Sequence, residues 1–206
     1  MKISGFGLKT NILTGTIGYQ KNLEIFFSTP IVAIDSSRMI LNSPTDTLTP
    51  VFVFTDTLQK NGEIRYDWVQ GDSYHLIIND STFTDLGGNY NDSIAYRFRF
   101  RTPEDYGFLF INILLPDSLS TPFIIQLMNE KELIIHQKTI KESGKVKFEY
   151  LLPGKYKLKA ISDINANGKW DSGRYTTALL PEKVWNFSAP IEIRANWDLQ
   201  EDWQLK

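Results

Sequence analysis

The stretch Ile94–Pro116, IAYRFRFRTPEDYGFLFINILLP, contains two β-type runs and the connection between them. In the first run Tyr96, Phe98 and Phe100 alternate with arginines, which is the period-two pattern of a half-buried antiparallel strand. A proline, two acidic residues and a glycine then separate this run from a second, apolar run. Because Pro and Gly mark breaks between elements, the stretch predicts the end of one β-domain and the beginning of another.

Short β-type runs recur on both sides of this connection and are separated by turn residues. No segment shows a sustained helical apolar period, so long helices are not expected. About a dozen strands at this spacing are typical of β-sandwiches. The chain has 206 residues, which is enough for two domains of about a hundred each. We therefore predict an all-β protein of two tandem β-sandwiches, residues 1–103 and residues 104–206.

Composition excludes several classes of function. The net charge is −2 and the 22 Lys and Arg residues are scattered, so a nucleic-acid partner is not expected. The chain has no cysteine, which excludes a disulfide framework, a thiol nucleophile and a zinc ribbon. No apolar stretch is long enough to cross a bilayer. The opening MKISGFGLKTNILTG lacks the apolar core of a secretory signal, which fits a cytoplasmic protein or a mature part of an exported one.

Two segments of the first half carry a resemblance to a known family. LEIFFSTPIVAIDSSRMIL, Leu23–Leu41, and FTDLGGNYND, Phe83–Asp92, resemble the bacterial Ig-like domain of the SbsA type. In that family a strand ends in a step similar to F-S-x-P, and a late loop carries D-x-x-G-N before the last strand. The resemblance implies an Ig-like sandwich in the first domain.

The second half resembles a different module. FEYLLPGKYKLKAISDINANGKWDSG, Phe148–Gly173, looks like the closing hairpin of transthyretin-like (prealbumin-like) sandwiches. Its continuation through PEKVWNF and IEIRANWDLQEDW is similar to the C-terminal module of Ig-like-domain lipoproteins common in Bacteroidota. Members of that family typically carry a signal and a lipid-bearing cysteine, which this sequence lacks. The resemblance implies the C-terminal portion of a longer lipoprotein, located in the periplasm or at the cell surface.

The segment DINANGKWD, Asp163–Asp171, places oxygen-bearing side chains at every second position and follows them with a glycine. An EF-hand-type loop has oxygen ligands at positions 1, 3, 5, 7 and 9 and a glycine at position 6. At position 12, where such loops carry a bidentate glutamate, this chain has Arg174. The pattern therefore predicts at most a weak structural Ca²⁺ site. Its candidate metal ligands are Asp163, Asn165, Asn167, the carbonyl oxygen of Lys169, and Asp171.

The same segment has a second interpretation that needs no ion. Asp and Asn side chains accept hydrogen bonds from nearby backbone amides, and Asn tolerates left-handed conformations. DINANG would then be a hydrogen-bonded loop that leaves a strand at Asp163. Glu182 could supply a further carboxylate from the next segment under either interpretation.

Four of the five tryptophans lie in the last 37 residues, together with Tyr175. One interpretation is an aromatic platform that stacks on sugar rings, as in a carbohydrate-binding module. The other is that these large side chains close the end of a small sandwich and cover the loop. The tryptophans are Trp68 in the first half and Trp170, Trp185, Trp197 and Trp203 in the second.

The sequence offers little for catalysis. His75 and His136 fall in separate predicted domains, and neither belongs to a readable triad or a metal-spaced pair. No sequence pattern places two carboxylates on either side of a cleft, as a glycosidase would need. This holds for both candidate pairs, Glu201 with Asp202 and Asp56 with Asp67. G-x-S-x-G and phosphate-binding glycine motifs are absent from the sequence. We therefore predict that the chain has no catalytic residues and is not an enzyme.

The predicted function is a structural or interaction module of an exported lipoprotein, with Ca²⁺ as a candidate structural ion. Its expected partner is another surface or outer-membrane protein, or a glycan. The alternatives are a carbohydrate-binding module that uses the C-terminal tryptophans, and an accessory subunit of an outer-membrane complex that binds through an exposed strand edge.

Overall fold

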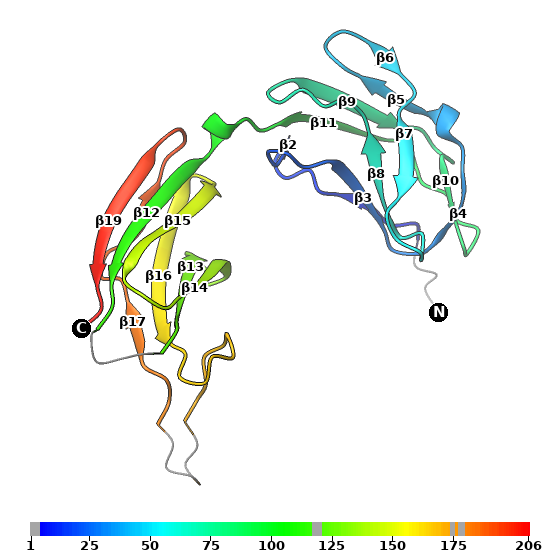
Figure 1. Cartoon of the computed structure of the whole chain (residues 1–206). Helices are drawn as coiled ribbons and strands as arrows, with labels where there is room; N and C mark the ends of the chain where they lie inside the picture. The colour runs from blue at the N-terminus through cyan, green and yellow to red at the C-terminus, as the bar shows by residue number, and fades with distance from the viewer. Residues whose placement is uncertain (1–4, 117–120, 174–175, 177–179) are drawn as a thin grey trace. The chain divides into compact units, whose positions relative to one another are not determined.

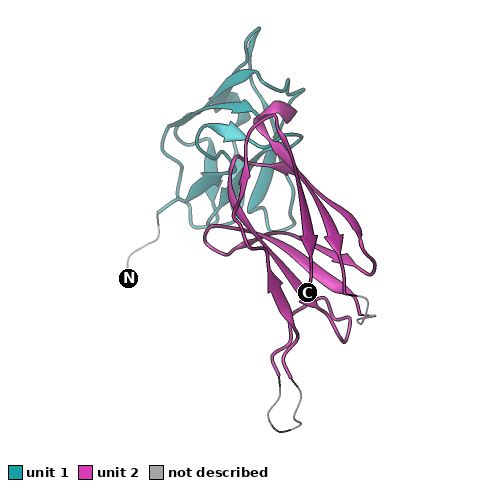
Figure 2. Cartoon of the chain, turned by 90° about the vertical axis from the view of Figure 1, so that its left-hand side faces the viewer, with its two compact units in different colours: residues 1–102 teal, residues 103–206 magenta. Residues whose placement is uncertain are grey.

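The structure is a computed structural model that describes residues 5–116, 121–173, 176 and 180–206 (Figure 1). Apart from single turns of 3₁₀-helix, the regular elements in these ranges are strands, which confirms the predicted all-β class. The chain divides into two compact units, Met1–Thr102 and Pro103–Lys206 (Figure 2). Among the described residues there is no helix with the length and apolar character needed to cross a membrane.

The described residues of unit 1 form eleven strands and one 3₁₀ turn, η1. The strands lie in a four-stranded sheet β1-β3-β8-β7, a five-stranded sheet β2-β11-β9-β5-β6 and a separate pair β10-β4. The elements are β1 Leu8–Thr10, β2 Thr16–Ile17, β3 Leu23–Phe27, β4 Ile31–Ile34, η1 Ser36–Arg38, β5 Met39–Asn42, β6 Thr47–Leu48, β7 Val51–Phe54, β8 Asn61–Arg65, β9 Ser73–Ile78, β10 Phe83–Asp85 and β11 Ile94–Phe100.

The core of unit 1 lies between these sheets. The four-stranded sheet contributes Leu23, Ile25 and Ile64, and the five-stranded sheet contributes Leu76 and Phe100, all fully buried. In β11 the phenylalanines face this core and the alternating arginines face away from it, as the period-two pattern predicts. The two sheets with their shared core form a β-sandwich.

Unit 2 begins with the 3₁₀ turn η2, Pro103–Asp105. It has a three-stranded sheet β15-β12-β19 and a second sheet β14-β13-β16-β17, in which β18 also pairs with β16. β12 pairs with β19 in parallel and with β15 in antiparallel orientation. The strands are β12 Gly107–Leu114, β13 Phe123–Asn129, β14 Ile134–Ile140, β15 Gly144–Leu151, β16 Gly154–Ser162, β17 Val184–Asn186, β18 Ile191–Ile193 and β19 Asp198–Gln204.

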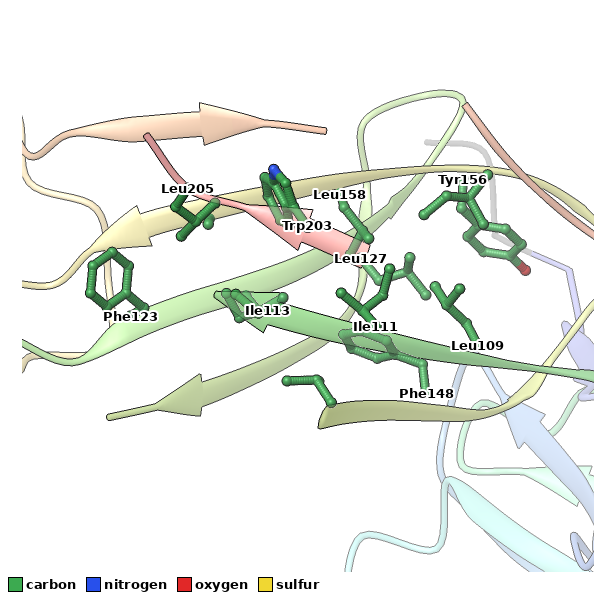
Figure 3. Packing of buried hydrophobic residues seen from close by; sticks show 14 of the residues in the cluster. Leu109, Ile111, Ile113, Phe123, Leu127, Phe148, Tyr156, Leu158, Trp203 and Leu205 are labelled. Carbon is green, nitrogen blue, oxygen red and sulfur yellow. The ribbon is translucent and has the colours of Figure 1, made fainter. Parts of the chain in front are cut away.

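The core of unit 2 fills the space between its two sheets (Figure 3). β12 alternates strictly, so that Leu109, Ile111 and Ile113 are buried while the residues between them are partly or fully exposed. β13 is different, because six consecutive residues from Phe123 to Met128 are buried. Both faces of this strand are therefore covered, although every pairing of the described strands in its sheet is antiparallel.

β14 forms one edge of the second sheet and pairs with β13 alone among the described strands. Six of its seven residues are exposed. The ladder between the two strands is irregular at Leu127 and Met128. On the inner side, the imidazole of His136 and the ammonium of Lys138 lie 6.1 Å and 5.7 Å from the ring of Phe148. A polar and a charged side chain thus share the inner face of this edge strand with Ile140, which packs against the core.

Candidate functional site

Asp163 anchors the candidate loop at the point where β16 ends. Its side chain is 1% exposed, and its backbone N–H donates to the carbonyl oxygen of Pro122 at 2.9 Å. Its carboxylate accepts the backbone N–H groups of Asn167 at 3.0 Å and Gly168 at 2.9 Å. The turn requires left-handed backbone at Gly168, with φ of 75°, which glycine adopts without steric cost. One buried carboxylate therefore closes the turn.

The two asparagines and Asp171 form the outer part of the loop. Asn165 Oδ1 accepts the N–H of Asn167 at 3.1 Å, and Asn167 Oδ1 accepts the N–H of Lys169 at 2.8 Å. The side-chain amides of Asn165 and Asn167 both donate to Asp171 Oδ2, at 2.6 Å and 2.7 Å. The structure thus brings together four predicted side chains and the backbone of Lys169.

Glu182 reaches this loop from the segment that precedes β17. It is 6% exposed, and its two carboxylate oxygens accept the backbone N–H groups of Ile164 at 2.7 Å and Asp171 at 2.9 Å. Its own N–H donates to the carbonyl oxygen of Asp171 at 3.1 Å. Glu182 therefore ties the beginning of the loop to its end. Arg174, at the twelfth position of the motif, lies outside the described residues, as does Tyr175.

The donor set can be compared with what Ca²⁺ requires. Carboxylate and amide oxygens are the hard ligands that this ion prefers, and Asp163, Asp171 and Glu182 all lie around one loop. As built, however, these oxygens accept N–H donors, and no three acidic or histidine side chains of the described residues converge on a common point. The ligand chemistry therefore fits Ca²⁺, while the hydrogen bonds already satisfy the loop without an ion.

The five tryptophans have separate roles. Trp185 and Trp203 pack against or within the core of unit 2, and Trp68 packs against Tyr74 in unit 1 at 4.9 Å. Trp170 is 49% exposed in the candidate loop, and Trp197 is 57% exposed beside the start of β12. Among the described aromatic residues no two indoles are in ring contact, and Trp170 and Trp197 are the exposed ones.

The histidines and the carboxylate pairs are placed as follows. His75 lies on β9 of unit 1, and His136 lies on β14 of unit 2. Partial burial, assisted by Lys138, lowers the pKa of His136. Asp56 accepts the backbone N–H groups of Lys60 and Asn61, so it caps a turn. The neighbours Glu201 and Asp202 point to opposite faces of β19 because successive strand residues alternate. Asp67 is exposed.

No protein-family model matches the sequence, and a search of curated proteins finds no match. Among solved structures, native α2-macroglobulin of Escherichia coli, domains MG0-NIE-MG1, is 10% identical, with 90% of this chain and 72% of that chain covered and a TM-score of 0.37. BcpA, the major pilin subunit of Bacillus cereus, is 8% identical, with 97% and 68% covered and a TM-score of 0.32. The Bacillus anthracis TIE protein is 12% identical, with 98% and 41% covered and a TM-score of 0.32. These similarities are too distant to assign a function. From its own geometry, the chain is an all-β protein of two tandem sandwiches.

Proposed function

We propose that the chain is a non-enzymatic structural and interaction module of an exported protein, located in the periplasm or at the cell surface. The resemblance to Ig-like-domain lipoproteins of Bacteroidota further supports a place in a lipid-anchored surface protein whose partner is another surface protein. In this role the two sandwiches act as preformed blocks, because each has its own core. The second sandwich follows the first directly in the chain, since unit 1 ends at Thr102 and unit 2 begins at Pro103.

The observation that carries this proposal is the use of the buried carboxylates. Asp85, Asp163 and Glu182 are each almost fully buried, and each accepts backbone N–H groups of a nearby loop. A buried acid that serves a catalytic role is normally poised toward a cleft or a second titratable group. These three instead hold loops in a fixed shape, which is the task of a scaffold.

The location is tested by protease accessibility in the cells that make the protein. An epitope tag placed after Lys206 is followed while intact cells are treated with protease and then fractionated. We expect the tag to be lost from intact cells, or to be released with the periplasm when the protein faces inward. A tag that stays in the cytosolic fraction would contradict the proposal.

We further propose that Ca²⁺ binds the loop and stabilises unit 2. The ligands would be Asp163, Asn165, Asn167, the carbonyl oxygen of Lys169, and Asp171, with Glu182 in place of the missing twelfth-position glutamate. Supporting this, Asp163 and Glu182 are already buried and positioned at the loop. With no glutamate in the motif itself, we expect the weak binding typical of extracellular modules, with a Kd of about 10⁻⁴ to 10⁻³ M.

A thermal melt in excess EDTA and in millimolar Ca²⁺ tests the ion. Binding to the folded state alone raises the melting temperature by mass action. We expect a rise for the natural chain that is lost in Asp163→Asn. Asp56→Asn is the matched control, since Asp56 also accepts two backbone N–H groups but lies in unit 1. A melting temperature independent of Ca²⁺ in the natural chain would show that the loop is held by hydrogen bonds alone.

A further inference from the structure

The outer face of the five-stranded sheet of unit 1 carries a hollow of about 590 Å³. Its floor is formed by β11 and β9, which lie side by side in the sheet (Figure 1). One wall is the turn Thr14–Thr16, held by the N–H of Arg99 donating to the carbonyl oxygen of Gly15 at 3.1 Å. The opposite wall is Asn42 and Ser43, where β5 turns toward β6. The hollow is therefore open on one side and framed by two turns.

The charge of this hollow differs from that of the chain as a whole. Arg97 and His75 are directly opposite each other in the ladder, and Arg99 lies two residues further along the same face. Along a strand this places the two arginine stems about 7 Å apart. None of the residues that line the hollow is acidic, and Arg97 has no ion-pair partner among the described residues. A cationic face thus stands on a chain whose net charge is −2.

The remaining lining groups are hydroxyls and amides. Thr14, Thr16, Ser43 and Ser73 bring hydroxyl groups, and Asn42 brings a side-chain amide. The hydroxyls of Thr14, Thr16 and Ser43 already donate to backbone carbonyl oxygens, so they face a ligand as acceptors. The two aromatic lining residues, Tyr74 and Phe98, are each 3% exposed and face the core, so they offer no ring for stacking. The hollow also lacks an exposed apolar anchor of the kind that dominates protein–protein contacts.

We propose that this hollow binds an acidic polysaccharide, one carboxylate of which pairs with Arg97. Guanidinium groups recognise carboxylates through paired hydrogen bonds, and the hydroxyl and amide walls suit a chain rich in hydroxyl groups. A neutral glycan would lack the aromatic stacking it needs, and an acidic peptide would lack an apolar anchor. The inference rests on the proposed interaction role, but the localisation experiment above and the binding experiment below can fail independently.

Binding is measured by calorimetry with the full chain and hexagalacturonate in EDTA, so that Ca²⁺ plays no part. Maltohexaose serves as the neutral counterpart and hexaglutamate as the acidic peptide. We expect hexagalacturonate to bind, its affinity to fall with added salt, and Arg97→Gln to weaken it about tenfold or more. Arg65→Gln, which removes an exposed arginine from the other sheet of unit 1, should change the affinity less than twofold.

A second pair of variants tests whether the ligand occupies the hollow, and leaves both arginines unchanged. Ser73 is exposed in the hollow, so Ser73→Glu adds a negative charge there and Ser73→Gln adds similar bulk without charge. The glutamate should weaken binding much more than the glutamine. The proposal is overturned if hexagalacturonate does not bind at millimolar concentration, if Arg97→Gln and Arg65→Gln weaken it equally, or if hexaglutamate binds as tightly.

Discussion

The carboxylate of Asp85 is almost fully buried at the end of β10, where it accepts the backbone N–H of Asn89 at 2.9 Å. That hydrogen bond lowers the pKa of Asp85, and the side-chain amide of Asn89 lowers it further. Burial acts in the opposite direction but is a smaller effect than the backbone hydrogen bond. A carboxyl whose pKa is lowered by folding stabilises the folded state above its unfolded pKa, near 4. The stabilisation is lost as the pH falls through the lowered value.

Asp85→Asn should therefore reduce the stability of unit 1 at pH 7 and have a smaller effect at pH 3, which lies below the pKa of the carboxyl in the unfolded chain. Urea unfolding of both proteins at the two pH values measures this difference. Asp46→Asn, at an exposed position, is the control and should show little effect at either pH. An equal loss for Asp85→Asn at pH 7 and pH 3 would show that charge is not what Asp85 contributes.

Gln70 presents the opposite case, because its buried Oε1 has no hydrogen-bond partner among the described atoms. Gln70→Met removes this acceptor, and we expect the free energy of unfolding to stay the same or to rise by about 1 kcal/mol. Gln126→Met is the comparison, since the buried Gln126 donates to Gln137 at 2.9 Å. That variant should lose about 1 kcal/mol. Chemical denaturation of both variants gives the two values.

The edge strand β14 carries features that discourage pairing with another chain. Inward-pointing charges and ladder irregularities are common ways to protect an edge, and β14 has both, in Lys138 and in its irregular ladder at Leu127 and Met128. Exposed apolar residues nevertheless lie at its beginning, including Ile134 and Ile135. The exposed isoleucines of β14 therefore favour association with another chain, and the charge of Lys138 opposes it.

Lys138→Val should therefore promote association of the chain through the edge of β14. With this lysine removed, the inward-pointing charge that protects the edge is lost, and we expect dimers or larger species by light scattering at protein concentrations where the natural chain shows none. Lys131→Val is the control, because Lys131 is exposed in the turn before β14 and lies outside the ladder. Equal association of both variants would indicate a general loss of solubility instead of edge pairing.

The alternation of apolar and polar residues predicted which face of a strand is buried. In β11 and β12 one face meets a core and the other meets solvent, so the period-two pattern predicts both strands. The burial of β13 and β14 does not follow this alternation. β13 is buried on both faces, and β14 is exposed at almost every residue. Which faces of a strand are covered depends on the tertiary fold, so a local sequence pattern predicts neither case.

The hydrogen-bonded loop was predictable because its Asp and Asn side chains lie within nine consecutive residues. The role of Glu182 depends on a return of the chain toward β16, so sequence could name it only as a possibility. The hollow in unit 1 was missed for a similar reason. Its arginines look like any solvent face of a strand, and only the sheet order brings His75 and Asn42 beside them.

At the scale of the whole molecule, two glycines allow the units to be destabilised one at a time. A Cβ at Gly62 would collide with the ring of Phe52, and one at Gly107 would collide with the carbonyl oxygen of Arg194 and lie 2.6 Å from Ile193 Cγ2. Each substitution to alanine should cost about 1–3 kcal/mol. Gly62 belongs to unit 1 and Gly107 to unit 2.

Hydrogen exchange followed by mass spectrometry reports on peptides of both units in one experiment. We expect Gly62→Ala to reduce protection in unit 1 alone, and Gly107→Ala to reduce it in unit 2 alone. Each variant serves as the control for the other. If either substitution lowers protection throughout the chain, the two sandwiches unfold as one cooperative block and do not act as separate modules.

The parallel pairing of β12 with β19 has a mechanical consequence for unit 2. These are its first and last strands, they lie side by side (Figure 1), and seven consecutive residue pairs join them from Phe108 with Asp198 to Leu114 with Gln204. Tension applied at the start of β12 and the end of β19 pulls the strands past each other along their length. Their hydrogen bonds are then loaded in shear and must fail together, whereas an antiparallel hairpin pulled at its open end unzips one rung at a time. Unit 2 should therefore resist stretching through its ends.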